Sequence, residues 1–491
     1  MDCILTLDVG TTGIKACLFD EQLNQTASAG REYSLLTGGC LVEAEPEDYL
    51  SAVRTCLRAL PDLRRVRAVA VTTQGETLIP VDADGRPLSR AVVWLDSRAE
   101  SAARELCEKL DGERFYRETG LPGLSGALPL CKLRQIKTER PALYEKTDKF
   151  LLLEDFLLHW LTGRMVTEKS LLTSTGYFSL RDDDYWDEAL RLAGVSRSKL
   201  PDPLECGEPV GRLLPEIAAE LGLPGDTLVV TGAMDQTAAA LAAGCTRPGI
   251  VSETTGTAMV AAAFTDRPVF RPEHHLTIYR HAMPGAWLYL PISNTAGMAL
   301  RWFRDTFCLD LPGGPAAYEA LDRLAAASRP GANGLSFLPY LAGSVDPENE
   351  PGAQGCFYGV RLSSTRGDFV RAVLESVGFQ LADFLDMLAR LGCGAESVVS
   401  LGGGSKSPLW RQIKADCCGL PVCTLPTSEA TSLGAAMLAA KALGWEEKPA
   451  PRQNICCPEE ENRAACAAAY RRWHELFAAV RPLFGKDDGS C

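Results

Sequence analysis

The sequence predicts an α/β protein built from two similar lobes, and two observations lead to that prediction. Apolar, β-rich runs alternate along the chain with helical patterns, an order typical of α/β architecture. In addition, a strand, a Thr/Gly turn and a second strand head the chain, with the turn at 10–13, and the same motif returns with its turn at 254–257. The repeat indicates an internal duplication, which we divide at Gly244 into lobes 1–244 and 245–491.

The first half contains five predicted strands and two predicted helices. A helix follows Pro46, where apolar residues recur at helical spacing, and an Ala-rich helix covers 237–243. The strands are expected at 4–8, 15–19, 66–72, 91–94 and 227–231.

The second half begins after a Gly/Pro break at 244–249. Strands at 250–253 and 258–264 flank the repeated turn, and a strand at 398–401 enters a glycine turn followed by a helix from Pro408. The tail after Leu443 is expected to be helical and to pack on the body of the protein.

Composition excludes several classes of protein. The chain of 491 residues is 46% hydrophobic and 23% charged, values near those of globular domains, which excludes disorder and collagen-like repeats. Its 50 Lys+Arg against 63 Asp+Glu give a net charge of −13, and such a surface repels nucleic acid. No run approaches the roughly 18 apolar residues of a membrane span, and the chain starts with a strand rather than a secretion signal. A cytoplasmic protein is expected.

The 18 cysteines are scattered and accompanied by only 5 histidines. Zinc sites and disulfide frameworks need regular clusters, and the pairs 417–418 and 456–457 are the nearest approach to one. Reduced thiols that act as small hydrophobic side chains are the prediction.

The first Thr/Gly turn has the chemistry of a phosphate site. Glycines bring backbone N–H groups close to a ligand, and the hydroxyls of Thr11 and Thr12 donate further hydrogen bonds. Lys15 adds a positive charge, and Asp8 is a candidate for holding Mg²⁺. The alternative is an ordinary tight hairpin with Asp8 in a turn hydrogen bond. The P-loop pattern is absent, which disfavours a Walker-type NTPase.

The glycine turn at 402–404 offers a flat surface for a nucleotide base or ribose. A dinucleotide-binding turn is disfavoured, because its G-x-G-x-x-G pattern requires glycine where Ser407 stands.

Asp235 is the candidate for acid–base chemistry. It follows a strand's carboxyl end, where open α/β sheets place their ligands, and a carboxylate there can accept the proton of an attacking hydroxyl. The alternative is a helix N-cap, since an Ala-rich helix follows directly.

Four more side chains lie at strand ends of the same lobe and fit a polyhydroxylated ligand: Gln74, Glu76, Trp94 and Asp96. For Trp94 the alternative is core packing.

Three segments together resemble a known family. The motif Asp-x-Gly-Thr-Thr-x-x-Lys at 8–15 is similar to the first phosphate motif of the FGGY carbohydrate kinases, relatives of actin and the heat-shock chaperones. The segments 355–360 and, seven residues later, 368–375 match that family's second signature at every defined position. The first signature, around 129–133, is partial, because Gln135 stands where the family usually has tryptophan.

The resemblance implies two lobes of the ribonuclease H-like, actin-like ATPase fold that close around a cleft and exclude water. It implies ATP and Mg²⁺ as cofactors, Asp235 as catalytic base and Asp8 beside the metal. The ATP contacts that it implies are Thr11, Thr12, Lys15, Gly256, Thr257, Gly297, Gly403, Gly404 and Ser407. We assign the small sugar or polyol to Gln74, Glu76, Trp94, Asp96 and Gln236, and we consider a homodimer.

The substrate is expected to be a ketopentose such as xylulose, phosphorylated at a primary hydroxyl. Where xylulokinases carry Gln-Met-His-Gly and glycerol kinases Gln-Arg-Glu-Thr, this chain has Gln-Gly-Glu-Thr at 74–77. Gly75 leaves room for a ligand larger than glycerol, and the segments 337–343 and 402–411 are similar to xylulokinases.

The alternatives are a glycerol or other polyol kinase and, in another class, an actin-like or chaperone-like ATPase or a sugar-sensing regulator. The latter proteins need no sugar-side base. A regulator usually carries a DNA-binding extension, for which a first strand at residue 4 leaves no room.

Overall fold

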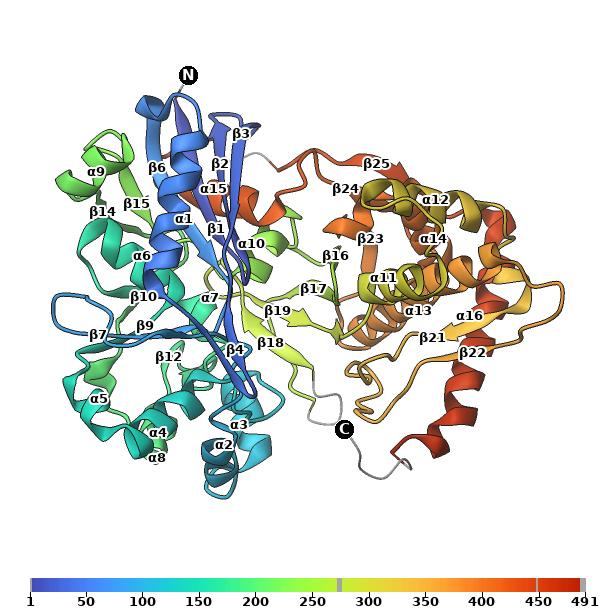
Figure 1. Cartoon of the computed structure of the whole chain (residues 1–491), viewed down its shortest axis with the longest axis horizontal. Coiled ribbons are helices and arrows are strands. Elements are labelled where there is room, and N and C mark those ends of the chain that lie inside the picture. The colour runs from blue at the N-terminus through green and yellow to red at the C-terminus, as the bar shows by residue number, and fades with distance from the viewer. Residues whose placement is uncertain (1, 272–275, 447–448, 486–491) are drawn as a thin grey trace.

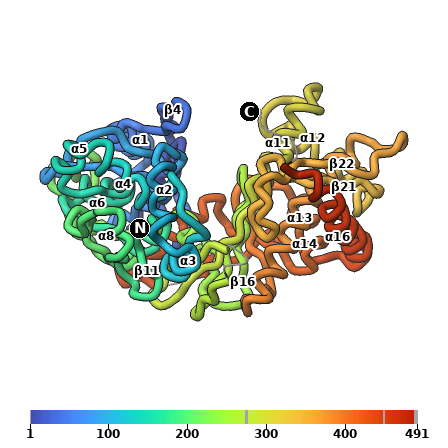
Figure 2. The backbone as a smooth tube through the Cα atoms, turned by 90° about the horizontal axis from the view of Figure 1, so that it is seen from below, coloured from blue at the N-terminus to red at the C-terminus, as the bar shows by residue number. Residues whose placement is uncertain are grey.

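Each half of the chain is built on a mixed β-sheet, and the two halves lie side by side (Figures 1 and 2). The structure is a computed structural model that describes residues 2–271, 276–446 and 449–485. The first sheet has the order β14-β15-β6-β1-β2-β3. Its strands are β1 (Cys3–Val9), β2 (Gly13–Asp20), β3 (Gln25–Glu32), β6 (Val66–Thr73), β14 (Pro209–Arg212) and β15 (Leu228–Val230).

The second sheet has the order β18-β19-β17-β16-β23-β24-β25, with β20 paired to β17. Its strands are β16 (Gly249–Thr255), β17 (Met259–Thr265), β18 (Thr277–Arg280), β19 (Trp287–Leu290), β20 (Ile292–Ser293), β23 (Ala395–Leu401), β24 (Val422–Thr424) and β25 (Gln453–Cys456).

The two sheets share one topology, which confirms the predicted two similar lobes. In the first, β1 pairs antiparallel with β2 and parallel with β6; in the second, β16 pairs antiparallel with β17 and parallel with β23. Even a register shift is repeated, between Cys3 and Ile4 in β1 and between Gly249 and Ile250 in β16. The apolar runs at 4–8 and 66–72 form adjacent buried strands, as their composition predicts for parallel neighbours.

Further elements surround the two sheets. The first half carries a five-stranded sheet and two strand pairs: β4 (Leu36–Gly38), β5 (Leu41–Ala44), β7 (Leu78–Val81), β8 (Ala91–Val92) and β9 (Lys149–Leu152), then β10 (Val166–Glu168) with β13 (Asp202–Leu204) and β11 (Phe178–Ser179) with β12 (Asp184–Tyr185). Its helices are α1 (Pro46–Ala59), α2 (Glu100–Cys107), α3 (Gly112–Thr119), α4 (Pro129–Glu139), α5 (Pro141–Lys146), α6 (Leu153–Thr162), α7 (Lys169–Leu172), α8 (Asp187–Ala193), α9 (Pro215–Leu221) and α10 (Asp235–Ala242), with 3-10 turns at Leu63–Arg65 and Arg197–Lys199.

The second half adds one more strand pair, β21 (Ser336–Leu338) with β22 (Cys356–Tyr358). Its helices are α11 (Gly297–Phe307), α12 (Pro315–Ala326), α13 (Arg366–Arg390), α14 (Pro408–Cys418), α15 (Ala430–Ala442) and α16 (Glu460–Val480), with 3-10 turns at Ala332–Gly334, Gly403–Lys406 and Arg481–Leu483. The long α13 begins at a capping box, in which Thr365 and Asp368 each bind the other's backbone N–H.

Two helices join the halves through a shared core. α15, from the second half, packs on β1 and β6 of the first sheet and crosses α10, and Figure 1 shows it in orange among the blue strands. At the crossing, a Cβ on Gly434 would lie 1.9 Å from the carbonyl oxygen of Ala238, so only glycine allows the helices to come this close. One apolar cluster holds residues of both sheets together with α10 and α15.

Two details differ from the expected elements. The strand expected at 91–94 is only Ala91–Val92 and belongs to the five-stranded sheet. The tail after Leu443 also contributes β25 to the second sheet before α16 packs on α14 and β21. Within the described residues, no helix has the length and apolar character that crossing a membrane requires.

Candidate active site

The carboxyl ends of three parallel strands of the first sheet meet at one edge. The N–H of Gln74, just after β6, donates to the carbonyl of Val9 at the end of β1 (3.1 Å). Thr73 forms a parallel bridge with Met234, which follows β15. The segments that carry Asp8, Gln74 and Asp235 therefore lie together, at the place where α/β sheets bind ligands.

Asp235 is the first residue of α10, not its N-cap, which is Met234, so the N-cap alternative is wrong. Its Oδ1 accepts the backbone N–H of Gln236 (2.5 Å), and both side chains are half-buried. Burial raises the pKa of Asp235 to about 6, and the hydrogen bond from Gln236 opposes that rise. A carboxylate with this pKa is charged at neutral pH and accepts a proton more readily than an ordinary aspartate.

Asp8 lies on β1 opposite Lys15 of β2 and is also half-buried. Burial and the nearby negative charge of Asp235 raise the pKa of Asp8 to about 7, while Lys15 lowers it. Two carboxylates close enough to repel each other are the oxygen donors that suit Mg²⁺, because the cation relieves their repulsion. Among the described residues, no group of three or more His, Cys, Asp and Glu side chains suits a metal ion.

Glu76 and Lys132 lie close enough at the same edge for their opposite charges to interact, with Lys132 buried and Glu76 half-buried. Burial raises the pKa of Glu76 and lowers that of Lys132, and the charge of each partner opposes the shift of the other. The Nζ of Lys132 donates to the carbonyls of Val93 (2.9 Å) and Glu76 (3.3 Å), so it fixes the backbone on both sides. Lys132 has no role predicted from the sequence, although it lies inside the partial signature at 129–133.

Gln74 has a free acceptor. Its Nε2 donates to the hydroxyl of Thr77 (3.1 Å), whereas its buried Oε1 has no partner within the described residues. An orphaned buried acceptor carries a desolvation cost that a ligand hydroxyl would remove. Gln74 is therefore well placed for the predicted sugar contact.

Trp94 and Asp96 differ from each other in what they offer a ligand. Trp94 is 37% exposed and donates its Nε1–H to the hydroxyl of Thr11 (3.0 Å). The alternative, that Trp94 packs in the core, is therefore wrong. Asp96 is fully buried, and its carboxylate accepts from the N–H of Val42 (2.6 Å) and from the guanidinium of Arg98. Burial alone would raise the pKa of Asp96, but these hydrogen bonds outweigh it and lower the pKa. They favour a structural role for Asp96 over the predicted substrate contact.

The first Thr/Gly turn is a tight hairpin closed by the N–H of Gly10 and the carbonyl of Gly13 (3.0 Å). The hydroxyl of Tyr33 donates to the carbonyl of Gly10, and Thr12 is exposed. Lys15 carries an ammonium that pairs with Glu429 beside α15 (2.6 Å). The turn thus presents Thr12 at the surface, with one cation nearby.

The second Thr/Gly turn is joined to the start of α11. Gly256 and Thr257 are exposed, and their carbonyls accept the N–H groups of Gly297 (3.0 Å) and Met298 (3.1 Å). A Cβ on Gly297 would lie 2.2 Å from the carbonyl oxygen of Gly256, so the contact requires glycine. The structure thus brings together three predicted nucleotide contacts.

The glycine turn packs on the same site. Gly402 has φ +74°, and a Cβ on Gly404 would lie 2.7 Å from the side chain of Thr255. A Cβ on Gly403 would lie 3.9 Å from the carbonyl oxygen of Thr255, an ordinary contact distance. Ser407, which is predicted to contact adenosine, caps α14: its hydroxyl accepts the N–H of Trp410 (3.0 Å). This bond gives Ser407 a structural role as well. A cavity of 310 Å³ adjoins the turn, and its lining includes Gly402, Ser405, Lys406, Arg411 and Thr427.

A buried ion pair that was not predicted from the sequence contacts Thr255, on which this turn packs. Lys414 and Glu253 are both fully buried, with Nζ and Oε2 2.9 Å apart, and Lys414 also donates to the hydroxyl of Thr255 (2.9 Å). The pair is formed across 161 residues, so no local pattern in the sequence indicates it.

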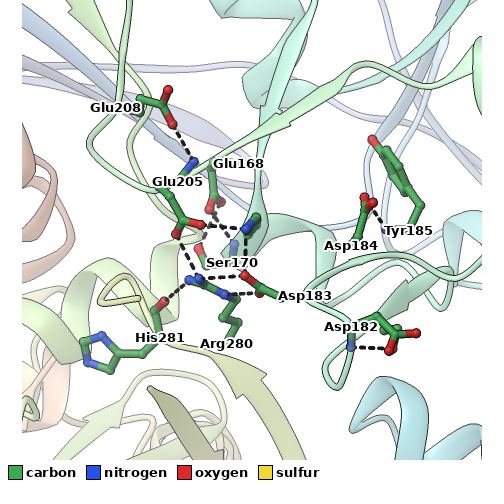
Figure 3. A network of polar contacts seen from close by, with 12 residues as sticks. Glu168, Ser170, Asp182, Asp183, Asp184, Tyr185, Glu205, Glu208, Arg280 and His281 are labelled. Atoms are coloured by element: carbon green, nitrogen blue, oxygen red, sulfur yellow. Dashed lines mark hydrogen bonds and ion pairs between the residues drawn. The ribbon is translucent and has the colours of Figure 1, made fainter. Parts of the chain in front are cut away.

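A second ion-pair cluster crosses from one half of the chain to the other (Figure 3). Arg280 on β18 contacts the carboxylates of Asp183 and Glu205, and Lys169 at the start of α7 binds the same two carboxylates at 2.6 Å each. Only 4% of the Arg280 side chain is exposed. Two cations and two anions balance, so the cluster ties β18 to the first lobe without a net buried charge.

The protein has two equivalent sheets, each with a glycine turn after its first strand, and carboxylates lie beside one of these turns. This arrangement is typical of a two-lobed phosphate-binding protein. Residues 3–242 match the N-terminal domain and residues 250–443 the C-terminal domain of the FGGY family of carbohydrate kinases. The chain belongs to this family, so it is a sugar kinase, and kinases of this family use ATP.

Individual relatives agree with this assignment. The gluconokinase of Bacillus subtilis is 30% identical over 90% of this chain and 88% of its own. The xylulose kinase of Escherichia coli is 28% identical over 97% of this chain and 99% of its own. The crystal structure of xylulose kinase from Rhodospirillum rubrum covers 99% of this chain and 100% of its own, with 28% identity and a TM-score of 0.89.

Proposed function

We propose that the protein transfers the γ-phosphate of ATP to a primary hydroxyl of a ketopentose, with xylulose as the first candidate and Asp235 as the base. The observation that carries the proposal is the position of Asp235, half-buried beside Asp8 and Glu76 at the carboxyl ends of three strands. A group there is close to both the predicted sugar side and the predicted phosphate side of the site.

In the transfer, the acceptor oxygen forms a bond to the γ-phosphorus while the bond from that phosphorus to the bridging oxygen breaks. ADP leaves with the electron pair, and the proton of the hydroxyl passes to the carboxylate of Asp235. The raised pKa of Asp235 matches this task, since the group is ionised at neutral pH and yet is basic enough to take the proton.

The nucleotide is assigned to the exposed parts of the three turns. Gly256 and Gly403 are suited to backbone contacts, because a Cβ at either position would meet no atom closer than 3.9 Å. Thr11, Thr12 and Lys15 face the phosphates in this proposal. Asp8 would hold Mg²⁺, which supplies positive charge to the phosphate oxygens when bound.

The side chains at this edge support a neutral sugar as the substrate. Gln74 keeps a buried Oε1 that has no partner among the described residues, and the partly exposed Trp94 lies beside Thr11. Asp8, Glu76 and Asp235 concentrate carboxylates at this edge, which favours a neutral ketopentose over the anion gluconate. Relatives named xylulose kinase that span almost the whole chain agree with this choice.

Gluconate is the second candidate, because a relative named gluconokinase matches at 30% identity. Glycerol is a third, since Glu76 and Thr77 are similar to glycerol kinases. ADP release measured with xylulose, ribulose, gluconate and glycerol separates them. The proposal expects the highest kcat/KM with a ketopentose, and turnover of gluconate or glycerol alone would overturn it.

Replacing Asp235 by Asn tests the base. The proposal expects kcat to fall on the order of 10²–10⁴-fold while the Kd of ATP stays within twofold. Unchanged turnover would refute the assignment.

We also propose a homodimer in the cytoplasm. Support for self-association comes from large apolar side chains exposed on the second half: Phe307, Leu309, Tyr358, Val360 and Leu362. Light scattering after gel filtration measures the mass, and a mass of 53.0 kDa would exclude the dimer.

A further inference from the structure

The turn that precedes Asp235 is fixed at each of its three residues. The N–H of Gly232 donates to Oε1 of Glu154 (2.9 Å), and the hydroxyl of Thr72 donates to the carbonyl of Ala233 (2.6 Å). The N–H of Met234 donates to the hydroxyl of Ser170 (3.0 Å). The last of these contacts is the nearest in sequence to the carboxylate that the proposed function uses.

The hydroxyl of Ser170 is itself held in one orientation. It donates to Oε1 of Glu168 (2.9 Å), so its lone pair is free to accept from Met234. Glu168 also accepts the N–H groups of Ser170 and Leu171 (2.6 Å each) and the thiol of Cys206 (2.8 Å). All these groups are buried or half-buried, and a hydrogen bond made away from water is costly to break.

The same segment is anchored to the second half of the chain. Lys169 lies between Glu168 and Ser170 and binds Asp183 and Glu205, which Arg280 of β18 contacts in turn (Figure 3). Ser170 therefore stands on a backbone that is fixed from two sides, and it has little freedom to follow a displaced Met234.

We propose that Ser170 is a positioning residue for Asp235: its hydroxyl, oriented by Glu168, fixes the backbone of Met234 and thereby the position of the neighbouring carboxylate. The inference rests on the proposed role of Asp235 as base. Since a proton is transferred only across a short, aligned contact, a small displacement of Asp235 slows the chemical step and leaves ATP binding intact.

The test compares two buried serines that make the same kinds of bond. Ser179 accepts the N–H of Asp182 (3.1 Å) and donates to Oε2 of Glu118 (3.0 Å), and within the described residues neither of these hydrogen bonds reaches the 232–235 segment. For Ser170→Ala we expect kcat to fall on the order of 10- to 100-fold with the KM of ATP within twofold. We expect the melting temperature to fall by a similar amount in Ser170→Ala and Ser179→Ala. For Ser179→Ala, however, kcat should stay within twofold of the parent.

Two further variants separate positioning from loss of structure. Ser170→Thr keeps the hydroxyl and should recover most of kcat. In an Asp235→Asn background, Ser170→Ala should change kcat by less than twofold, because the carboxylate that it positions is already gone.

Each contrary result has one meaning. A kcat of Ser170→Ala within twofold of the parent, an equal loss in Ser179→Ala, or a further tenfold loss in the double variant would overturn the inference. Full activity of Asp235→Asn alone would instead overturn the proposed function. The Ala pair decides the question even where Ser170→Thr fails to fold.

Discussion

Lys15 and Glu429 form an ion pair, with Nζ and Oε2 2.6 Å apart, although 414 residues separate them in the chain. Lys15 lies on β2 beside the first Thr/Gly turn, and Glu429 immediately precedes α15. The ammonium assigned to the phosphates of ATP thus already has an anionic partner from the second half of the chain.

This pair predicts opposite effects of two substitutions on ATP binding. The side chain of Lys15 is 54% exposed, so the pair contributes at most about 1 kcal/mol. Glu429→Gln should lower the KM of ATP by up to about fivefold, because Lys15 is released, whereas Lys15→Met should raise it. Steady-state kinetics at low and high salt measure both values, and an unchanged KM in both variants would remove Lys15 from the phosphate site.

The pKa of Asp235 predicts a pH limit on turnover. Burial raises this pKa to about 6, so the carboxyl group gains a proton as the pH falls through 6 and then cannot accept one from the sugar. We expect log kcat at saturating substrates to be level near pH 7.5 and to fall with a slope of one below pH 6. A level profile down to pH 5, in protein that remains folded, would contradict the assignment.

Gly297 predicts a steric test of the nucleotide site. Gly297→Ala places a Cβ 2.2 Å from the carbonyl oxygen of Gly256 and must displace the second Thr/Gly turn. The KM of ATP should rise at least on the order of tenfold with little change in the KM of the sugar. Gly313→Ala is the control, because a Cβ there meets nothing within 4 Å.

The cluster around Arg280 predicts a large loss of stability. Arg280→Ala leaves Asp183 and Glu205 with Lys169 as their remaining partner. The side chains of Asp183 and Glu205 are 38% and 33% exposed, so the loss should lie between about 1 kcal/mol, the value of an exposed pair, and about 3–5 kcal/mol, the cost of breaking a buried one. Urea unfolding measures the loss. Arg117→Ala breaks an exposed pair with Glu113 and should cost about 0.3–0.5 kcal/mol, so equal effects of the two variants would contradict a larger contribution from the buried Arg280.

Asp155 predicts how stability changes with pH. Burial raises its pKa to about 7, so the folded protein holds this proton more tightly than the unfolded chain does. That contribution is complete below about pH 4 and is lost as the pH rises to 7, a change on the order of 4 kcal/mol. Asp155→Asn should reduce the pH dependence of the melting temperature between pH 5 and 8, and the exposed Asp148→Asn should not.

The sequence predicted what depends on short segments of chain. The repeated Thr/Gly turn indicated two similar lobes, and the position of Asp235 after a strand indicated the edge where Asp8 and Gln74 also lie. Contacts between distant segments were not predictable. Lys414 reaches Glu253 across 161 residues and Arg280 reaches Asp183 across 97, and one sequence carries no pattern that pairs such side chains.

Asp96 and Trp94 show the same limit at the site itself. Both follow the same short strand, and spacing alone gave them the same role. The structure separates them, because Arg98 and the N–H of Val42 occupy the carboxylate of Asp96 while Trp94 remains partly exposed.

The packing of α15 on the first sheet has a consequence for synthesis of the protein. β1 and β6 leave the ribosome early, but the helix that covers them ends at Ala442, 200 residues after α10 ends at Ala242. At about 5–20 residues per second, that apolar face still waits roughly 10–40 s for its cover after α10 is complete. The nascent first lobe is therefore a natural client for a chaperone, and a chain cut before α15 should aggregate rather than fold as an independent unit.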